Sequence, residues 1–289
     1  MNNQDASSRL ENESDFRISY TVDSFGNGIA FGKHKHRIDD DPREHYYLRL
    51  EDKSELVKLK SRYSIENSKP LSELESHLKS LSKQGVLAQA VIHLGTSTDP
   101  FIPFEGKFDV SIKFLELFKK YTPGLLVVQT RSPLIVVAMP VLTALGNRCS
   151  VTIGVETHKD EIRQKYTPHL PRIEERIKTA RALRRFGIEV QLHATPILPY
   201  GDWKKEAVDF AEFLAENSDF VFVKGFNLDN NISKKSRIAR RLAAERKFHW
   251  LRKDAATPVL NALEKIAPEK LIQPAREQLR DKQLDMFAA

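Results

Sequence analysis

Cysteine is almost absent from this sequence: Cys149 is the single cysteine among 289 residues. One thiol excludes an intrachain disulfide framework and any metal site built only from cysteines. Long apolar runs are also missing, and without a run of about 18 apolar residues no transmembrane helix is expected. Residues 1–15 are polar and lack the apolar segment of a secretory signal. We therefore expect a cytoplasmic protein with no membrane partner.

The charge balance of the chain is basic. Lys and Arg number 46 against 39 Asp and Glu, a formal net charge of +7. Such a balance permits a polyanionic partner but does not identify one. Hydrophobic residues make up 40% of the chain, which is enough to bury a core.

Short apolar runs alternate with helical patterns along the chain. The runs lie at residues 16–22, 86–94, 124–129, 150–155, 188–194 and 219–223. Apolar residues three and four apart predict helices at 71–81, 114–121, 137–145, 173–186 and 205–216. Gly187 follows one of these helices, where a left-handed cap is expected. The alternation predicts an α/β fold with a parallel sheet, either a partial barrel or a doubly wound sheet.

Polar residues follow the predicted strands at the point where each strand ends. Loops after parallel strands share one edge of the sheet, so these side chains are expected to meet in one pocket. Ordinary turn formation explains any one of these loops equally well, and only the whole set favours a pocket. The candidate pocket residues are Thr96, Thr98, Asp99, Thr130, Arg131, Ser132, Glu156 and Thr157.

Residues 95–105, GTSTDPFIPFE, resemble the GT-x-TDPYQPxE segment of the spore photoproduct lyase-like radical SAM proteins. Further similar pieces follow in the family's order: Thr130-Arg131-Ser132 for Thr-Lys-Ser, a helix with Pro171 and Arg176, Phe186-Gly187-Ile188, and Pro196-Ile197-Leu198-Pro199. The resemblance spans residues 88–226. It implies a partial (β/α)6 TIM-like barrel that binds S-adenosylmethionine at the strand carboxyl ends. Arg131 keeps the charge of the family's lysine but changes the donor geometry.

The main departure from the family concerns its [4Fe–4S] cluster. The family holds the cluster with a Cys-x-x-x-Cys-x-x-Cys loop after the first strand, which corresponds to a predicted loop at residues 23–36. No cysteine occurs there, so a [4Fe–4S] cluster is not expected. His34, His36 and His158 are residue types that bind metals, although a solvated loop explains the first two equally well.

A basic segment follows the predicted barrel. Residues 233–253 contain nine Lys or Arg and one acidic residue, Glu245, with aromatic residues among them. Cationic side chains neutralise phosphates and aromatic rings stack on bases, so the segment predicts DNA contact. A solvated amphipathic helix is the alternative. The candidate nucleic-acid-binding residues are Lys234, Lys235, Arg237, Arg240, Arg241, Arg246, Lys247 and Trp250.

The chain ends in QLDMFAA, in which Gln283, Leu284, Met286 and Phe287 resemble the bacterial sliding-clamp binding motif. In that motif the apolar side chains enter a groove while the glutamine amide supplies directional hydrogen bonds. A last helical turn that docks on the protein's own surface is the alternative.

We expect four parts: a disordered lead-in (1–15), a radical SAM-like partial barrel (16–230), a basic helical extension (231–267) and a C-terminal helix or tail with the clamp motif (268–289). The first hypothesis is a DNA repair or tolerance factor tethered to the clamp. The second is an active lyase or metal-dependent DNA-processing enzyme with an unusual cofactor. The third is a non-catalytic interaction protein with a vestigial pocket.

Overall fold

The computed structural model describes residues 18–25, 28–33, 70–95, 99–101, 109–226 and 237–272. Several predicted features lie outside these residues. They are the lead-in at 1–15, the candidate residues His34, His36, Thr96, Thr98, Lys234 and Lys235, and the tail residues Gln283, Leu284, Met286 and Phe287.

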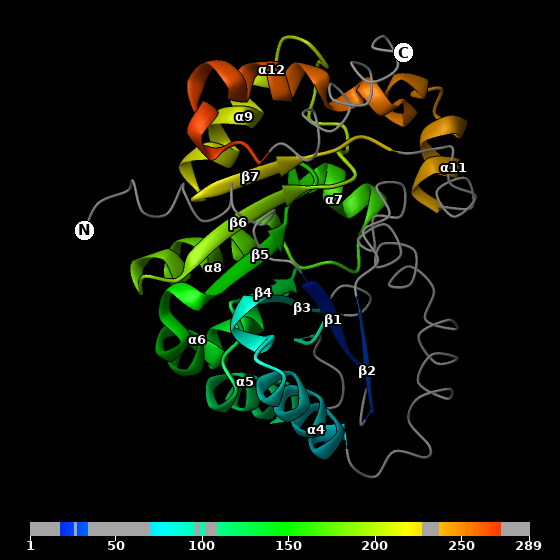
Figure 1. Ribbon diagram of the computed structural model, residues 1–289. Helices are drawn as coiled ribbons and strands as arrows, with labels where there is room; N and C mark the ends of the chain where they lie inside the picture. The colour runs from blue at the N-terminus through cyan, green and yellow to red at the C-terminus, as the bar shows by residue number, and fades with distance from the viewer. Residues whose placement is uncertain are drawn as a thin grey trace, which may run out of the picture.

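A seven-stranded sheet with the order β2-β1-β3-β4-β5-β6-β7 forms the centre of the protein (Figure 1). Six strands run parallel, one from each predicted apolar run: β1 Ile18–Phe25, β3 Ala90–Leu94, β4 Leu125–Thr130, β5 Cys149–Gly154, β6 Glu189–Ala194 and β7 Phe220–Val223. Within the described residues no ladder joins the two outer strands, so the barrel is open. The prediction of a partial, parallel barrel is confirmed.

The seventh strand, β2 at Gly28–Lys33, corrects the prediction of a loop at residues 23–36. It pairs antiparallel with β1, from Phe25 opposite Gly28 to Tyr20 opposite Lys33. This pairing satisfies backbone groups that β1 would otherwise present at an open sheet edge. The end of β1 and the whole of β2 therefore lie in the segment in which the cluster loop was expected.

The helices of the barrel are α4 Pro70–Lys83, α5 Asp109–Lys120, α6 Met139–Leu145, α7 Asp160–Tyr166, α8 Ile173–Arg185 and α9 Ala207–Glu216. All five predicted helices are present, whereas α7 was not predicted. The run at 86–94 is a strand only from Ala90, because Leu87–Gln89 forms a 3₁₀ turn. Gly187 has φ +75°, which confirms the predicted left-handed cap after α8.

The two faces of the sheet differ in chemistry. One face packs against the helices and is apolar, with Ile92, Val128, Ile153 and Leu192 in the main core. The opposite face has a small apolar cluster of Val91, Leu125 and Val127 near the strand starts. Toward the strand ends it becomes polar, since Gln129, Thr152 and Gln191 lie side by side in register. The interior of the barrel is therefore suited to a polar ligand.

The basic extension is part of the same folded unit. It contains α11 Arg237–Ala244, a 3₁₀ turn at Phe248–Leu251, a second at Lys253–Ala256, and α12 Thr257–Ile266. Ile238, Leu242 and Trp250 are buried in the main core. The segment is not one continuous helix, because Arg246 has φ +58° after α11 ends. None of the described helices is long and apolar enough to cross a membrane.

Candidate functional site at the strand carboxyl ends

Asp99 joins the ends of the neighbouring strands β3 and β4. Its Oδ1 accepts hydrogen bonds from the Thr130 hydroxyl at 2.7 Å and from the Phe101 backbone N–H at 2.9 Å. Its Oδ2 accepts one from the Arg131 backbone N–H at 2.7 Å. Asp99 is 6% exposed. The structure therefore brings Asp99, Thr130 and Arg131 together as predicted, but the Asp99 carboxylate is occupied by the protein itself.

Glu156, after β5, lies between two arginines. Arg131 Nε donates to Glu156 Oε1 at 2.5 Å, and Arg176 Nη1, from α8, donates to Oε2 at 3.0 Å. All three side chains are at most 9% exposed. Arg176 also donates to the backbone oxygens of Gly154 and Pro171. This buried Arg–Glu–Arg group fastens β4, β5 and α8 to one another.

The remaining predicted pocket residues also make internal hydrogen bonds. Thr157 donates through Oγ1 to the Pro199 carbonyl at 2.9 Å, which ties the end of β5 to the turn after β6. The Ser132 side chain accepts from the Leu134 backbone N–H at 3.3 Å and begins the 3₁₀ turn at Pro133–Ala138. The predicted residues that the structure describes are thus neighbours, and most of them hold the loops in place.

A small pocket, partly open to solvent, lies beside this network. It is lined by Gly95, Gln129, Thr130, Arg131, Thr152, Gly154, His193 and Thr195. Gly154 is required there by the close approach of Arg131: a Cβ on Gly154 would lie 2.7 Å from Arg131 Nε. Sequence reasoning missed Gln129 and Thr152, because a polar residue inside an apolar run does not reveal which face of the sheet it occupies. It also missed Thr195, which directly follows the run at 188–194.

The polar wall of the pocket continues along β5 and β6. Gln191 Nε2 donates to Ser150 Oγ at 3.0 Å, and Gln191 Oε1 lies 3.2 Å from His193 Nε2. Thr152, which is 3% exposed, has a buried hydroxyl without a hydrogen-bond partner in the structure. Buried hydroxyls normally have a partner. The wall therefore offers a bound polar molecule an unused hydroxyl next to a guanidinium.

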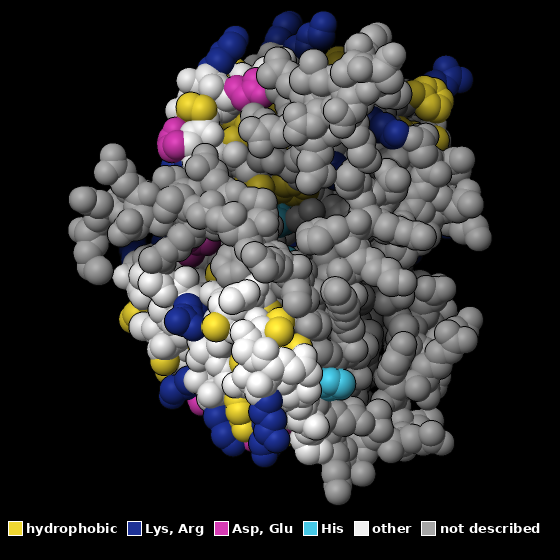
Figure 2. Space-filling view, in the orientation of Figure 1, with side chains coloured by type: hydrophobic (Ala, Val, Ile, Leu, Met, Phe, Trp, Pro, Cys, Tyr) yellow, Lys and Arg dark blue, Asp and Glu magenta, His cyan; other side chains and the backbone are white. Residues whose placement is uncertain are grey.

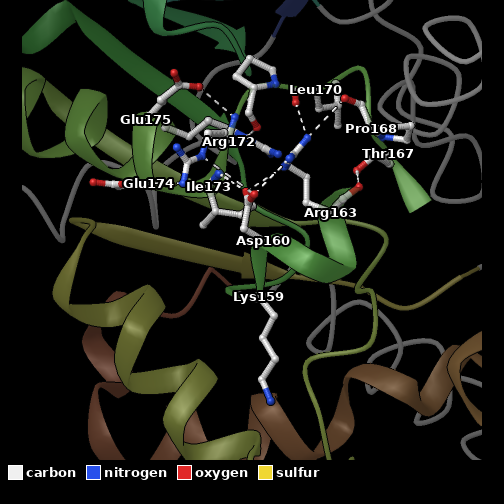
Figure 3. Close-up of polar contacts among 12 residues, drawn as sticks. Lys159, Asp160, Arg163, Thr167, Pro168, Leu170, Arg172, Ile173, Glu174 and Glu175 are labelled. Atoms are coloured by element: carbon white, nitrogen blue, oxygen red, sulfur yellow. Dashed lines mark hydrogen bonds and ion pairs between the residues drawn. The ribbon is translucent and has the colours of Figure 1, made fainter. Parts of the chain in front are cut away.

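The loop that carries Glu156 and Thr157 is shaped by Asp160, at the start of α7 (Figure 3). Arg163 forms a two-point ion pair with Asp160, with Nε–Oδ1 at 2.7 Å and Nη2–Oδ2 at 3.0 Å. The backbone N–H of Ile173, at the start of α8, also donates to Asp160. The hydrogen bond from Arg163 is the main reason that the pKa of Asp160 falls to about 2. Asp160 thereby holds the beginnings of α7 and α8 together.

The described residues do not fit an iron–sulfur cluster. Cys149 lies at the amino end of β5, away from the pocket, and is 1% exposed. Burial raises the pKa of its thiol to about 12, so the thiolate that a cluster needs is disfavoured. In the described ranges no group of three or more His, Cys, Asp or Glu side chains could hold a metal. His158 instead packs against the rings of Phe210 and Phe213.

Within the basic extension, α11 lies on the side of the sheet toward which β6 and β7 point (Figure 1). Desolvation and the charge of Arg131 lower the pKa of His169, and Arg237 of α11 acts on this histidine in the same direction. Arg237, Arg240, Arg241 and Arg246 are exposed. Figure 2 shows dark-blue Lys and Arg side chains along the upper edge of the described surface, over α12, and others along its lower edge.

Trp250 does not belong to this exposed set. It is 2% exposed and packs edge-on against Tyr200, with ring centroids 4.8 Å apart. Its side chain is therefore not accessible to bases in this structure, contrary to the sequence-based expectation. Phe248, at 59% exposure, faces solvent.

Comparison with known proteins supports the fold described above. No family model and no curated protein matches the sequence. The structure of spore photoproduct lyase complexed with dinucleoside spore photoproduct is similar, with a TM-score of 0.51, 14% identity, and coverage of 80% of this chain and 72% of that chain. A mutant of the same lyase gives a TM-score of 0.51 with 13% identity, over 80% of this chain and 73% of that one. The chain therefore has the partial-barrel fold of spore photoproduct lyase, to which its sequence motifs also bear a resemblance.

Proposed function

We propose that this protein is a DNA-associated repair or tolerance factor, built on a barrel of the spore photoproduct lyase type that operates without the family's iron–sulfur cluster. The observation that carries the proposal is the row of exposed arginines on α11, of which Arg237 acts electrostatically on the same His169 as the pocket residue Arg131. A spore photoproduct lyase of the same fold has been solved in complex with a dinucleoside spore photoproduct. That complex supports a nucleic-acid ligand for the present chain.

The exposed arginines of the extension are the proposed DNA contacts. Arg240 and Arg246 are exposed and make no ion pair with any described residue. Phosphate contacts of this kind supply sequence-independent affinity that falls as salt is added. Phe248 is the proposed stacking side chain in place of the buried Trp250.

The pocket is the proposed site for a small polar ligand, either S-adenosylmethionine or a flipped part of the DNA. Arg131 and the free hydroxyl of Thr152 are the groups that would hold it. S-adenosylmethionine would supply a sulfonium group. Its reductive cleavage needs an electron from a cluster, and the single cysteine of this chain cannot hold a cluster in the family's way.

The tail residues Gln283, Leu284, Met286 and Phe287 are proposed to tether the protein to the sliding clamp. Deletion of residues 283–289 should abolish binding of the full chain to purified clamp in surface plasmon resonance. The same deletion should leave DNA affinity unchanged, because the cationic surface is elsewhere in the chain. Clamp binding that persists after the deletion would refute the assignment of the motif.

DNA binding is tested by fluorescence anisotropy with a labelled duplex and a labelled single strand over a range of salt concentrations. The double variant Arg240→Ala/Arg246→Ala should weaken binding and reduce the slope of log K against log salt by about 1 per removed contact. Arg148→Ala, an exposed cation in the turn before β5, is the control and should change little. Equal effects of the variant and the control would exclude α11 as the DNA site.

The enzymatic alternative makes a different prediction for metal content. We expect no stoichiometric iron or sulfide in protein purified and reconstituted without oxygen. Substantial iron–sulfur absorbance would instead support an active lyase with unfamiliar ligands. A divalent metal contacting both Glu156 and His158 would support the metal-dependent enzyme, although Glu156 is paired with two arginines and His158 packs on aromatic rings.

A further inference from the structure

A cluster of cationic side chains joins α7 to the end of α11, although the two segments are about 80 residues apart in sequence. Lys165 Nζ lies 2.7 Å from Glu245 Oε2, and Lys247 Nζ lies 3.4 Å from the same oxygen. Arg241 Nε lies 3.6 Å from Glu245 Oε1. Three cations therefore share a single carboxylate.

Tyr166 forms the floor of this cluster. Its side chain is almost fully buried, and its hydroxyl donates to Glu245 Oε2 at 2.7 Å. The charged groups of Lys165, Arg241 and Lys247 lie 5.6, 5.7 and 5.7 Å from the centre of its ring. Arg241 also donates to the Lys165 backbone carbonyl. The geometry is thus fixed by contacts from both segments.

The cluster carries an excess of positive charge. Lys165, Arg241 and Lys247 contribute +3 and Glu245 contributes −1, which leaves +2 at an accessible place. The side chains of the three cations are 34–51% exposed, so an incoming anion can reach them. Partial burial would raise the pKa of Glu245, but hydrogen bonds from Lys165 and Tyr166 and the nearby cations bring it down to about 2. Glu245 therefore stays charged at neutral pH.

We propose that Lys165, Arg241 and Lys247 form a phosphate site for the DNA backbone, in which Glu245 is the internal counterion that a phosphate replaces. The inference rests on the proposed DNA-binding function and extends it to α7, which the sequence did not indicate. A phosphate offers several acceptor oxygens and suits lysine and arginine donors arranged around one point. Glu245 keeps these donors in place while DNA is absent, and its negative charge lowers the affinity for DNA.

The test is the substitution Glu245→Gln in the full chain, measured by anisotropy with the labelled DNA duplex at low salt. Removal of one negative charge about 6 Å from a phosphate should tighten binding roughly threefold or more. Thermal unfolding should occur at a lower temperature, since Lys165 and Tyr166 lose a charged acceptor. A purely structural role for Glu245 predicts lower stability without a gain in DNA affinity. A lower melting temperature together with a higher DNA affinity therefore identifies the proposed site.

Two further variants keep the test decisive. Glu174→Gln removes the same charge from an exposed pair with Lys178 on α8, and it should leave DNA affinity nearly unchanged. Lys165→Ala should weaken binding about as much as the loss of one phosphate contact. An equal gain in DNA affinity for Glu174→Gln would show that the effect of Glu245→Gln comes only from the change in net charge. That result would overturn the inference.

The outcomes also separate this inference from the proposed function. If the wild-type chain binds DNA and Glu245→Gln binds no better, the inference is wrong and the proposed function stands. If neither binds, both are wrong. If only Glu245→Gln binds, the internal counterion is confirmed.

Discussion

Replacement of Glu156 by glutamine tests the central feature of the site. The substitution keeps the shape of the side chain but removes the charge shared by Arg131 and Arg176. Glu156 is 1% exposed, Arg131 is 9% exposed and Arg176 is fully buried. Two guanidinium groups would therefore lose the negative charge that they share, and that of Arg176 is fully buried.

The expected loss follows from the cost of an uncompensated buried charge. Removal of one partner from a buried ion pair typically costs about 3–5 kcal/mol, because the remaining charge is not resolvated. For a chain of 289 residues, with an unfolding entropy of about 0.6 kcal/mol/K, that loss corresponds to a fall of roughly 5–8 °C in melting temperature. Urea unfolding followed by circular dichroism measures the free-energy change directly, provided that the transition remains two-state.

Glu174→Gln is the matched control for this measurement. Glu174 pairs with Lys178 at 2.7 Å, but both side chains are more than half exposed. Exposed pairs of this kind contribute about 0.3–0.5 kcal/mol. A loss below about 1 kcal/mol for Glu156→Gln, comparable to the control, would refute the view that Glu156 is a desolvated structural counterion. Glu156 would then again be a candidate for direct ligand binding.

Two other substitutions test the surroundings of the site by urea unfolding. Asp160→Asn should cost about 1–2 kcal/mol at neutral pH, because the buried Arg163 guanidinium loses its two-point partner while the Asp160 carboxylate itself is partly screened by water; a loss near zero would contradict the assigned role. Since the folded-state pKa of Asp160 is about 2 against an ordinary 3.8, its stabilisation is present above pH 4 and is lost as the pH falls through 2. The difference in unfolding free energy between wild type and Asp160→Asn should shrink as the pH falls from 4 to 2. A difference that grows as the pH falls would contradict the lowered pKa of Asp160. Gly154→Ala should cost about 1–3 kcal/mol, because the new methyl group would meet Arg131 Nε at 2.7 Å; a neutral effect would show that Arg131 moves freely.

The sequence by itself determined the order and direction of the main elements. Alternation of apolar runs and helical patterns located all six parallel strands, because a buried strand needs a continuous apolar stretch that is visible locally. Gly187 indicated the end of α8 for a similarly local reason, since a left-handed residue favours glycine. The convergence of Asp99, Arg131 and Glu156 also followed, because parallel strands present their carboxyl ends on one edge.

Only the tertiary structure decided what these residues do there. Whether a carboxylate binds a ligand or a neighbouring arginine depends on side chains that are distant in sequence, such as Arg176 against Glu156. The same holds for Lys165 and Glu245, which meet across two helices. Trp250 could be exposed or buried on sequence grounds, and its contact with Tyr200 places it in the core. Periodicity records which residues are apolar, whereas charge pairing and burial arise from long-range packing that the local pattern does not contain.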